Sequence, residues 1–209
     1  MSTRPSRKSA TEYEAKMLLR KYGIPTTDFA VVKSGGSIEI EFPAVLKVLS
    51  PDILHKTDVG GVRLNILNRE ELERELGRFR EKFPGSDFLV EKMEPQGVEM
   101  IAGLVNDPSF GMSIMVGMGG IFAEVYRDVS FRLVPITEKD AGEMLDDLKA
   151  GVIFDGFRGM DLDKNAMVDL LVNLSRMGTE EPIDQMDLNP VLVYRHGVKV
   201  VDAKLVKGE

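Results

Sequence analysis

One lysine in the first third of this sequence is placed where it could hold phosphate groups, and a polar loop with a single histidine follows it. Lys47 interrupts an otherwise apolar run, residues 43–49, which is predicted to form a strand, and the polar loop of residues 50–60 with His55 follows it. A lysine that faces a loop with free backbone amides can hold a polyphosphate as a point charge. The residues alone leave an alternative open, in which the lysine stem packs along apolar surface and the loop is only solvated.

A second polar group lies in a predicted hairpin near the C-terminus. Two apolar-rich segments, residues 187–194 and 198–205, flank a His-Gly dipeptide that begins at His196 and is typical of a hairpin turn. A two-residue turn at this dipeptide places Leu192 opposite Val201 on the apolar side of the hairpin. His196 is therefore interpreted as a turn residue without a chemical role.

The other face of this hairpin carries oxygen ligands, namely Asp187, Asn189 and Asp202. In the expected register Asn189 is diagonal to Asp202, roughly 7–8 Å away at the backbone, so both side chains could reach one ion. Oxygen ligands from two or three residues, completed by phosphates and waters, suit magnesium. A strand face that is merely solvated is the alternative interpretation of the same residues.

Composition excludes several other kinds of site. The sequence has no cysteine, which rules out thiolate metal sites and cysteine nucleophiles, and its two histidines are too few for a multi-histidine zinc site. A net charge of −7 gives no global basic field for nucleic acid, and no apolar stretch is long enough to span a bilayer. The first ten residues lack the apolar core of a signal peptide. We expect a soluble, cytoplasmic protein without nucleic-acid or membrane partners.

The elements that position these residues alternate between helix and strand, but not in a strict βαβα order, so we expect an α+β fold with mixed sheets. Asn68, with Glu71 three residues later, predicts a helix start. The other expected elements are helices that begin at Ser9 (a capping box of Ser9 with Glu12), at Thr137 and at about Asp163 (closed by Gly178), and strands at residues 29–32, 43–49, 61–67, 88–93, 98–105, 113–116 and 130–135.

Several long segments resemble one known family. They are EYEAK and YGIP near the start, SPDILHKTDVGG around His55, VEKMEPQGVEMIAGLVNDPSFG, GMGGIFAEVYRDVSFRLVPI, GFRG, and DLNPVLV with VDAK near the end. Over nearly the whole chain the sequence is similar to the β subunit of ADP-forming acyl-CoA synthetases such as acetyl-CoA synthetase. That family is a branch of the ATP-grasp superfamily related to succinyl-CoA synthetase.

The resemblance implies a specific chemistry for the loop. In the family Lys47 matches a lysine that contacts ATP phosphates, and His55 matches a histidine that is phosphorylated and relays the phosphoryl group between ATP and a second histidine on an α subunit. Imidazole suits this role because it is nucleophilic at neutral pH and forms a labile phosphoramidate. The loop lies where other ATP-grasp enzymes have their mobile phosphate-covering loop. Lys56 and Asp58 flank His55 and either position it or are simply exposed.

The resemblance also assigns nucleotide and metal contacts. It implies that the strand backbone at Glu91, Lys92 and Met93 meets the adenine edge. Glu99 matches an acidic position near the ribose and phosphates, with a solvated strand carboxylate as the alternative. The implied magnesium ligands are Asn189 and Asp202, with Asp187 as a further candidate beside them.

A glycine-rich segment, residues 117–122, completes the candidate site. By itself it is weak evidence, because it lacks the G-x-G-x-x-G spacing. In the family this region, which includes Gly119 and Gly120, lines the site of phosphoryl transfer. Three arginines are candidate phosphate or subunit contacts, or else ordinary surface residues: Arg127, Arg132 and Arg158.

The implied fold is an ATP-grasp domain of two α+β subdomains with ATP between them. A small lobe, residues 26–90, would carry Lys47 and the His55 loop. A larger lobe, residues 91–209 together with the N-terminal helix at residues 9–22, would carry the hinge and the magnesium hairpin. The implied cofactors are ATP or ADP and Mg²⁺.

The sequence contains neither a G-x-G-x-x-G nucleotide fold for CoA nor a second histidine loop, so it is expected to be half of an enzyme. The resemblance implies a CoA- and acyl-binding α subunit in an α2β2 assembly, which interconverts acyl-CoA, ADP and phosphate with acid, CoA and ATP. Two rivals stay open at this point. One is another ATP-grasp ligase, which forms a free acylphosphate without a loop histidine, and the other is a non-catalytic nucleotide-sensing subunit.

Overall fold

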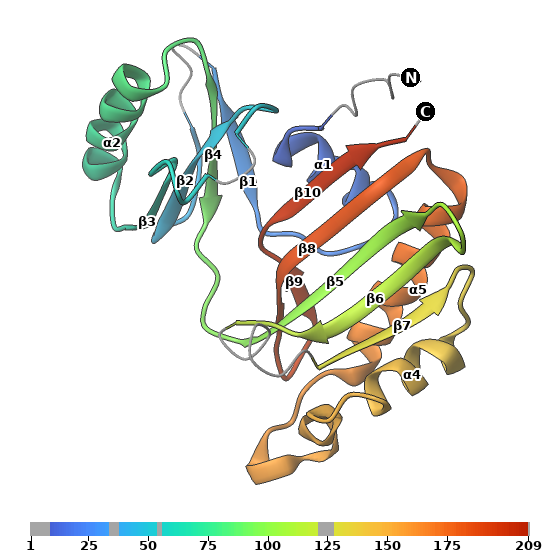
Figure 1. The fold of residues 1–209 in the computed structure, drawn as a ribbon. Helices are drawn as coiled ribbons and strands as arrows, with labels where there is room; N and C mark the ends of the chain where they lie inside the picture. The colour runs from blue at the N-terminus through green and yellow to red at the C-terminus, as the bar shows by residue number, and fades with distance from the viewer. Residues whose placement is uncertain (1–8, 34–37, 54–55, 121–127, 209) are drawn as a thin grey trace, which may run out of the picture. The chain divides into compact units, whose positions relative to one another are not determined.

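The computed structural model describes residues 9–33, 38–53, 56–120 and 128–208, which divide into two compact units (Figure 1). The smaller unit is Thr27–Pro95, and the larger unit joins the residues up to Thr26 with those from Gln96 onward. The expected boundary between residues 90 and 91 falls inside strand β4 (Asp87–Lys92). Because a paired strand stays with its sheet, the three expected hinge residues belong to the smaller unit and not to the larger one.

The smaller unit is a four-stranded antiparallel sheet in the order β1-β4-β2-β3, with one helix packed against it. Its strands are β1 (Phe29–Val32), β2 (Ala44–Leu49), β3 (Val62–Ile66) and β4. Every residue of β2 is buried, which agrees with the nearly continuous apolar run in the sequence. Lys47 is therefore a charged side chain in a buried strand.

Helix α2 (Arg69–Lys82) begins as the sequence predicts. The Asn68 side chain accepts a hydrogen bond from the Glu71 N–H at 3.0 Å, which satisfies one of the donors left open at a helix N-terminus. Leu72, Leu76 and Phe79 are buried on one face of the helix and form a core with β2 and β4.

The larger unit is a six-stranded antiparallel sheet in the order β10-β8-β5-β6-β7, with β9 paired to β8. The strands are β5 (Val98–Asp107), β6 (Gly111–Met118), β7 (Val129–Leu133), β8 (Ile183–Val193), β9 (Val198–Val200) and β10 (Ala203–Lys207). Both sheets are thus antiparallel in their described strand pairs, not mixed as expected. The expected α+β class is confirmed.

Two helices, α4 (Glu138–Asp146) and α5 (Lys164–Glu180), cover one face of this sheet (Figure 1). They are linked by the short 3-10 turns η1 (Gly151–Asp155) and η2 (Phe157–Gly159). Thr137 and Asp140 form the expected capping box of α4. Among the described helices, none combines the length and apolarity that crossing a bilayer requires.

The capping residue of helix α1 (Glu12–Lys21) lies two residues later than predicted. Thr11 is the capping residue, and its capping-box partner is Glu14, whose carboxylate accepts from the Thr11 N–H at 2.8 Å. The expected pair of Ser9 and Glu12 is wrong, because Ser9 pairs with β10 in an isolated antiparallel bridge. Glu12 is buried and pairs with Lys16 instead.

Helix α5 also continues past the expected stop. Gly178 lies inside the helix, where a β-carbon would come within 3.1–3.3 Å of the side chains of Leu104 and Met112. The glycine permits close packing of α5 on the sheet and does not end the helix. The helix begins where expected, with Asp163 as its capping residue. The Asp163 carboxylate accepts hydrogen bonds from the N–H groups of Ala166 and Gly197, and these bonds hold the pKa of its carboxyl below the usual value.

We expect Ser175→Ala to destabilise the larger unit. The Ser175 side chain, buried on α5, accepts a hydrogen bond from the Ile136 N–H at 2.9 Å. Without the Ser175 hydroxyl the buried N–H of Ile136 loses its acceptor, which costs about 1–3 kcal/mol of folding stability. Urea unfolding of the full chain measures the loss, and Ser109→Ala in the exposed turn between β5 and β6 should stay within about 0.5 kcal/mol of the parent chain. Equal stability of the two variants would contradict this role of Ser175.

Candidate functional site

The ammonium group of Lys47 is held by a buried carboxylate. Lys47 is 5% exposed and Glu91 1% exposed, and Nζ of the lysine lies 2.8 Å from Oε2 of the glutamate. The pairing of β2 with β4 explains the contact, since Lys47 is opposite Leu89 and Glu91 lies two residues along β4 on the same face. The Thr27 hydroxyl donates to the other carboxylate oxygen at 3.2 Å. The side chain of Glu91 therefore positions the cation.

At the expected adenine hinge, two backbone N–H groups are already hydrogen-bonded within the smaller unit. The Lys92 N–H donates to the carbonyl of Asp28 at 2.9 Å, and the Met93 N–H donates to the carbonyl of Pro43 at 2.8 Å. In this conformation these two donors are not presented to a ligand. The Lys92 side chain pairs with Glu41, and this hydrogen bond raises the pKa of the lysine.

The loop after β2 closes tightly on its two glycines. A β-carbon at Gly61 would lie 2.6 Å from the Val48 side chain and 3.0 Å from the Lys56 carbonyl, and Gly60 has a positive φ of 61°. Lys56 is buried and Asp58 is exposed. His55 itself lies outside the described residues, so its predicted role stays a prediction.

The hairpin has a register that differs by two residues from the expected one. Leu192 is opposite Lys199, not Val201, and the two residues between the paired Tyr194 and Gly197 are Arg195 and His196. The Gly197 N–H donates to the Asp163 carboxylate at 2.7 Å, which ties the turn to the start of α5. Gly197 has a positive φ of 83°, and the contact with the start of α5 stabilises this turn further.

This register brings the two expected metal ligands directly opposite each other. The pairing of β8 with β10 continues to Asn189 and Asp202, where the Asn189 N–H donates to the Asp202 carbonyl at 3.2 Å. Directly opposite residues have β-carbons about 4.5–5.5 Å apart, closer than the diagonal arrangement that was expected. Asn189 is exposed and Asp202 half-buried, so both can face a ligand.

Asp187 lies on the same face but opposite Lys204. Burial raises the pKa of its carboxyl, and the Lys204 ammonium lowers it in part. Among the described residues no group of three acidic, histidine or cysteine side chains forms a complete metal cage. An amide and a carboxylate oxygen side by side fit a magnesium ion that keeps phosphate and water ligands.

Glu99 and the glycine turn form a third part of the candidate site. The Gly119 N–H donates to the Glu99 carbonyl at 2.8 Å, and a β-carbon at Gly119 or Gly120 would lie about 3 Å from Glu99 atoms. Glycine is therefore required for the turn to pack against this strand. In the neighbouring strand, a bulge sets the two β8 residues Asn189 and Pro190 against Ile101, two residues along β5 from Glu99. Glu99, the glycines and the hairpin oxygens thus belong to one unit, and Lys47 with Glu91 to the other.

Comparison with known proteins identifies the family. Residues 2–206 match the ATP-grasp domain family. The chain is 39% identical to the β subunit of acetate–CoA ligase [ADP-forming] I of Pyrococcus furiosus, over 93% of this chain and 90% of that subunit. The chain belongs to the β subunits of ADP-forming acetyl-CoA synthetases, within the ATP-grasp family. The expected family and ATP-grasp fold are confirmed.

Two further relatives show how such a β-type chain occurs. Acetate–CoA ligase [ADP-forming] II of Archaeoglobus fulgidus is 41% identical, and the match covers 95% of this chain but only 30% of that longer protein. The solved acetyl-coenzyme A synthetase 1 of Candidatus Korarchaeum cryptofilum, in complex with coenzyme A and Ca-AMPCP, is 44% identical with a TM-score of 0.88, over 97% of this chain and 94% of the matched chain.

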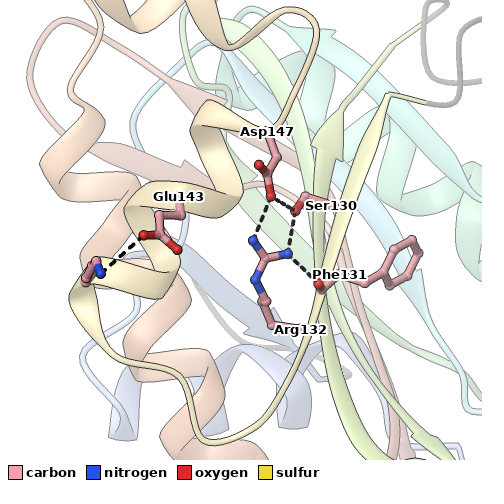
Figure 2. A network of polar contacts seen from close by, with 6 residues as sticks. Ser130, Phe131, Arg132, Glu143 and Asp147 are labelled. Carbon is pink, nitrogen blue, oxygen red and sulfur yellow. Dashed lines mark hydrogen bonds and ion pairs between the residues drawn. The ribbon is translucent and has the colours of Figure 1, made fainter.

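Of the three candidate arginines, Arg132 has a structural contact in this β-subunit fold. Figure 2 shows its guanidinium between β7 and the end of α4, where Nη2 lies 2.7 Å from Oδ2 of Asp147 and Nη1 lies 2.9 Å from the Phe131 carbonyl. Arg158 is exposed, has a positive φ of 52° and lies 5.5 Å from the ring of Phe157. Arg127 lies outside the described residues.

Two groups that were not predicted from the sequence lie at or beside predicted site residues of the β subunit. Thr27 holds the Glu91 carboxylate, and no local pattern marks it because the contact spans 64 positions. Lys16, buried on α1, donates to the carbonyl of Val201, next to Asp202. Its i,i+4 spacing from Glu12 was a visible signal for an ion pair.

We expect Lys47 to be needed for polyphosphate binding. Because removing one partner alone leaves a buried charge, the informative comparison is the parent chain with the double variant Glu91→Gln/Lys47→Met. The double variant should bind ATP at least about 10-fold more weakly than the parent chain, since a hydrogen bond from a charged group contributes about 1.5–3 kcal/mol. Titration calorimetry measures both affinities, with Lys33→Met, at an exposed lysine after β1, as the control. Equal affinities would remove Lys47 from the nucleotide site.

Asn189 and Asp202 should control the magnesium dependence. Asn189→Ala or Asp202→Ala should lower magnesium-dependent phosphoryl transfer by a factor of about 10² or more, as expected when a ligand to a charge-stabilising ion is lost. The measurement is ATP formation against magnesium concentration in the presence of the partner subunit. Asp169→Ala, at an exposed carboxylate on α5, is the matched control. Normal magnesium dependence in both hairpin variants would show that this face is merely solvated.

Proposed function

We propose that this chain is the nucleotide-binding half of an enzyme that interconverts acyl-CoA, ADP and phosphate with the acid, CoA and ATP. The observation that carries the proposal is the match to β subunits over nine-tenths of both lengths, in Pyrococcus furiosus ligase I and, at 41% identity, in ligase II. These relatives are named acetate–CoA ligases, so a small carboxylic acid is the first substrate to test. The chain would meet the nucleotide, and the acyl group would bind to the partner.

In the proposed reaction, Lys47 neutralises charge on the polyphosphate while Glu91 and Thr27 hold the lysine in place. The unprotonated nitrogen of His55 attacks the γ-phosphorus of ATP, and an N–P bond forms as the bond from that phosphorus to the bridging oxygen of ADP breaks. In the reverse direction the phosphoryl group returns from His55 to ADP. Magnesium, when bound at Asn189 and Asp202, supplies charge stabilisation for this transfer.

The partner is proposed to be an α subunit that binds CoA and the acyl substrate, in an α2β2 assembly in the cytoplasm. A longer relative with the same ligase name supports a partner, because the match covers only 30% of the Archaeoglobus fulgidus protein and leaves room in it for a second part. A solved relative with coenzyme A and Mg-AMPPCP, 45% identical and with a TM-score of 0.85, is described with its phosphohistidine segment pointing towards the nucleotide binding site. This description supports a phosphohistidine step over an ATP-grasp ligase that releases a free acylphosphate.

His55 distinguishes the proposed relay from its rivals. With γ-labelled ATP, magnesium and the partner subunit, acid-labile and base-stable phosphate should appear on this chain. His55→Ala should abolish both the label and ATP formation, because the described part of the chain offers only His196, which lies in a turn, as another imidazole. Nucleotide binding should survive in this variant, since Lys47 and the metal ligands remain.

His196→Ala is the matched control and should label normally. A label that persists on His55→Ala, or full activity of that variant, would overturn the relay and favour a ligase with a free acylphosphate. Nucleotide binding without any phosphoryl exchange in the parent chain and its partner would favour a sensing subunit.

A further inference from the structure

The larger unit contains a fully buried lysine that the proposed chemistry does not use. Lys16, on α1, is 0% exposed. Its Nζ lies 3.1 Å from Oε1 of Glu12, one helical turn earlier, and donates to the carbonyl oxygen of Val201 at 2.7 Å. The lysine therefore links an N-terminal helix to a backbone group 185 positions later in the chain.

The carbonyl that Lys16 holds lies immediately before Asp202. Val201 and Asp202 form the break between β9 and β10, where the chain leaves one short strand and enters the next. The Val201 N–H donates to the Pro190 carbonyl at 3.0 Å, and the Asp202 carbonyl accepts from the Asn189 N–H at 3.2 Å. Lys16 holds the carbonyl of the peptide that leads into Asp202, and these two backbone hydrogen bonds hold the peptide groups before and after it.

A buried ion pair is an unusual choice for anchoring a helix. Transfer of an ammonium and a carboxylate out of water is costly, and apolar residues of similar volume are often equally or more stabilising. Ala15 and Leu19 on the same helix already pack in the core of this unit. What the ammonium adds is a short, charge-assisted hydrogen bond that sets the orientation of one peptide group.

We propose that Lys16, held by Glu12, is a positioning residue for the metal ligands. By fixing the Val201 carbonyl it sets the backbone angles that aim the Asp202 side chain at the ion shared with Asn189. This inference rests on the proposed magnesium role of these two residues. Lys16 itself touches neither nucleotide nor metal in this assignment, so it acts only through Asp202.

The test compares metal affinity with fold stability. Glu12→Gln/Lys16→Met removes the pair without leaving a single buried charge, and Lys16→Gln keeps a polar donor of similar size. Binding of Mn²⁺ to the full chain in the presence of ADP is measured by electron paramagnetic resonance, and ADP binding in the presence of a chelator by calorimetry. Melting temperatures and circular dichroism report the fold.

We expect the double variant to bind Mn²⁺ at least 10-fold more weakly, Lys16→Gln to show a smaller loss, and metal-free ADP binding to be unchanged in both. Leu19→Ala, at a buried position on the same helix, is the matched control, and it should lower the melting temperature but leave Mn²⁺ affinity unchanged. Should the double variant not fold, Lys16→Gln against Leu19→Ala decides the question.

Parental Mn²⁺ affinity in the double variant, or in Lys16→Gln if only that one folds, would overturn the positioning role. An equal loss in Leu19→Ala would also overturn it, because Lys16 would then be only an anchor of α1. Asp202→Asn separates this outcome from failure of the proposed site. Loss of Mn²⁺ binding in Asp202→Asn supports the metal site, whereas parental binding there would overturn both the metal site and the role of Lys16.

Discussion

A lysine ammonium that is taken out of water must be met by an anion or a carbonyl, and both units of this chain contain one. In the smaller unit Lys47 meets Glu91 at 2.8 Å. In the larger unit Lys16 meets Glu12 at 3.1 Å and the Val201 carbonyl at 2.7 Å. An unpaired charge at either position would destabilise its core by several kcal/mol, so these pairs restrict how the surrounding strands and α1 can pack. The first pair contains the predicted phosphate-binding residue Lys47, and the second holds the carbonyl next to the predicted metal ligand Asp202.

The Lys47–Glu91 pair has a direct consequence for phosphate binding. Fixing a flexible lysine side chain costs about 2 kcal/mol of conformational entropy. Because the Glu91 carboxylate already orders Lys47, less of this entropy is lost when the nucleotide binds. The carboxylate also competes with phosphate for the same ammonium. The expected affinity for a polyphosphate is therefore set by the balance between Glu91 and the phosphate oxygens, with the Thr27 hydroxyl holding the carboxylate in its place.

The candidate site also requires that two loop backbones pack closely against neighbouring strands. Gly61 and Gly119 each occupy a position where a β-carbon would come within 3 Å of neighbouring atoms. Both glycines lie at an end of a segment assigned to phosphate handling, the His55 loop and the glycine turn beside Glu99. These positions exclude side chains so that the loops can close against their own strands, which explains glycine there without reference to a ligand.

Local patterns in the sequence were sufficient for the elements whose causes are local. The Asn68 and Thr137 caps, the buried face of α2 and the buried strand that carries Lys47 follow from residues within one or two turns of each other. The resemblance to β subunits gave the family and named the candidate residues, since long motifs do not depend on contacts between distant parts of the chain.

Tertiary structure alone decided the contacts between distant segments. Asp163, which caps α5, accepts a hydrogen bond from the Gly197 N–H and so stabilises the hairpin turn in the register that has Asn189 opposite Asp202. The start of α1 depends on Ser9 pairing with β10, and Gly178 stays helical because α5 packs against Leu104 of β5. The partners of Lys16 and Lys47 depend likewise on helix and strand packing. Hydrophobic periodicity and secondary-structure propensity describe one segment of the chain at a time. A strand register or a buried ion pair depends instead on the distant segment that satisfies its hydrogen bonds.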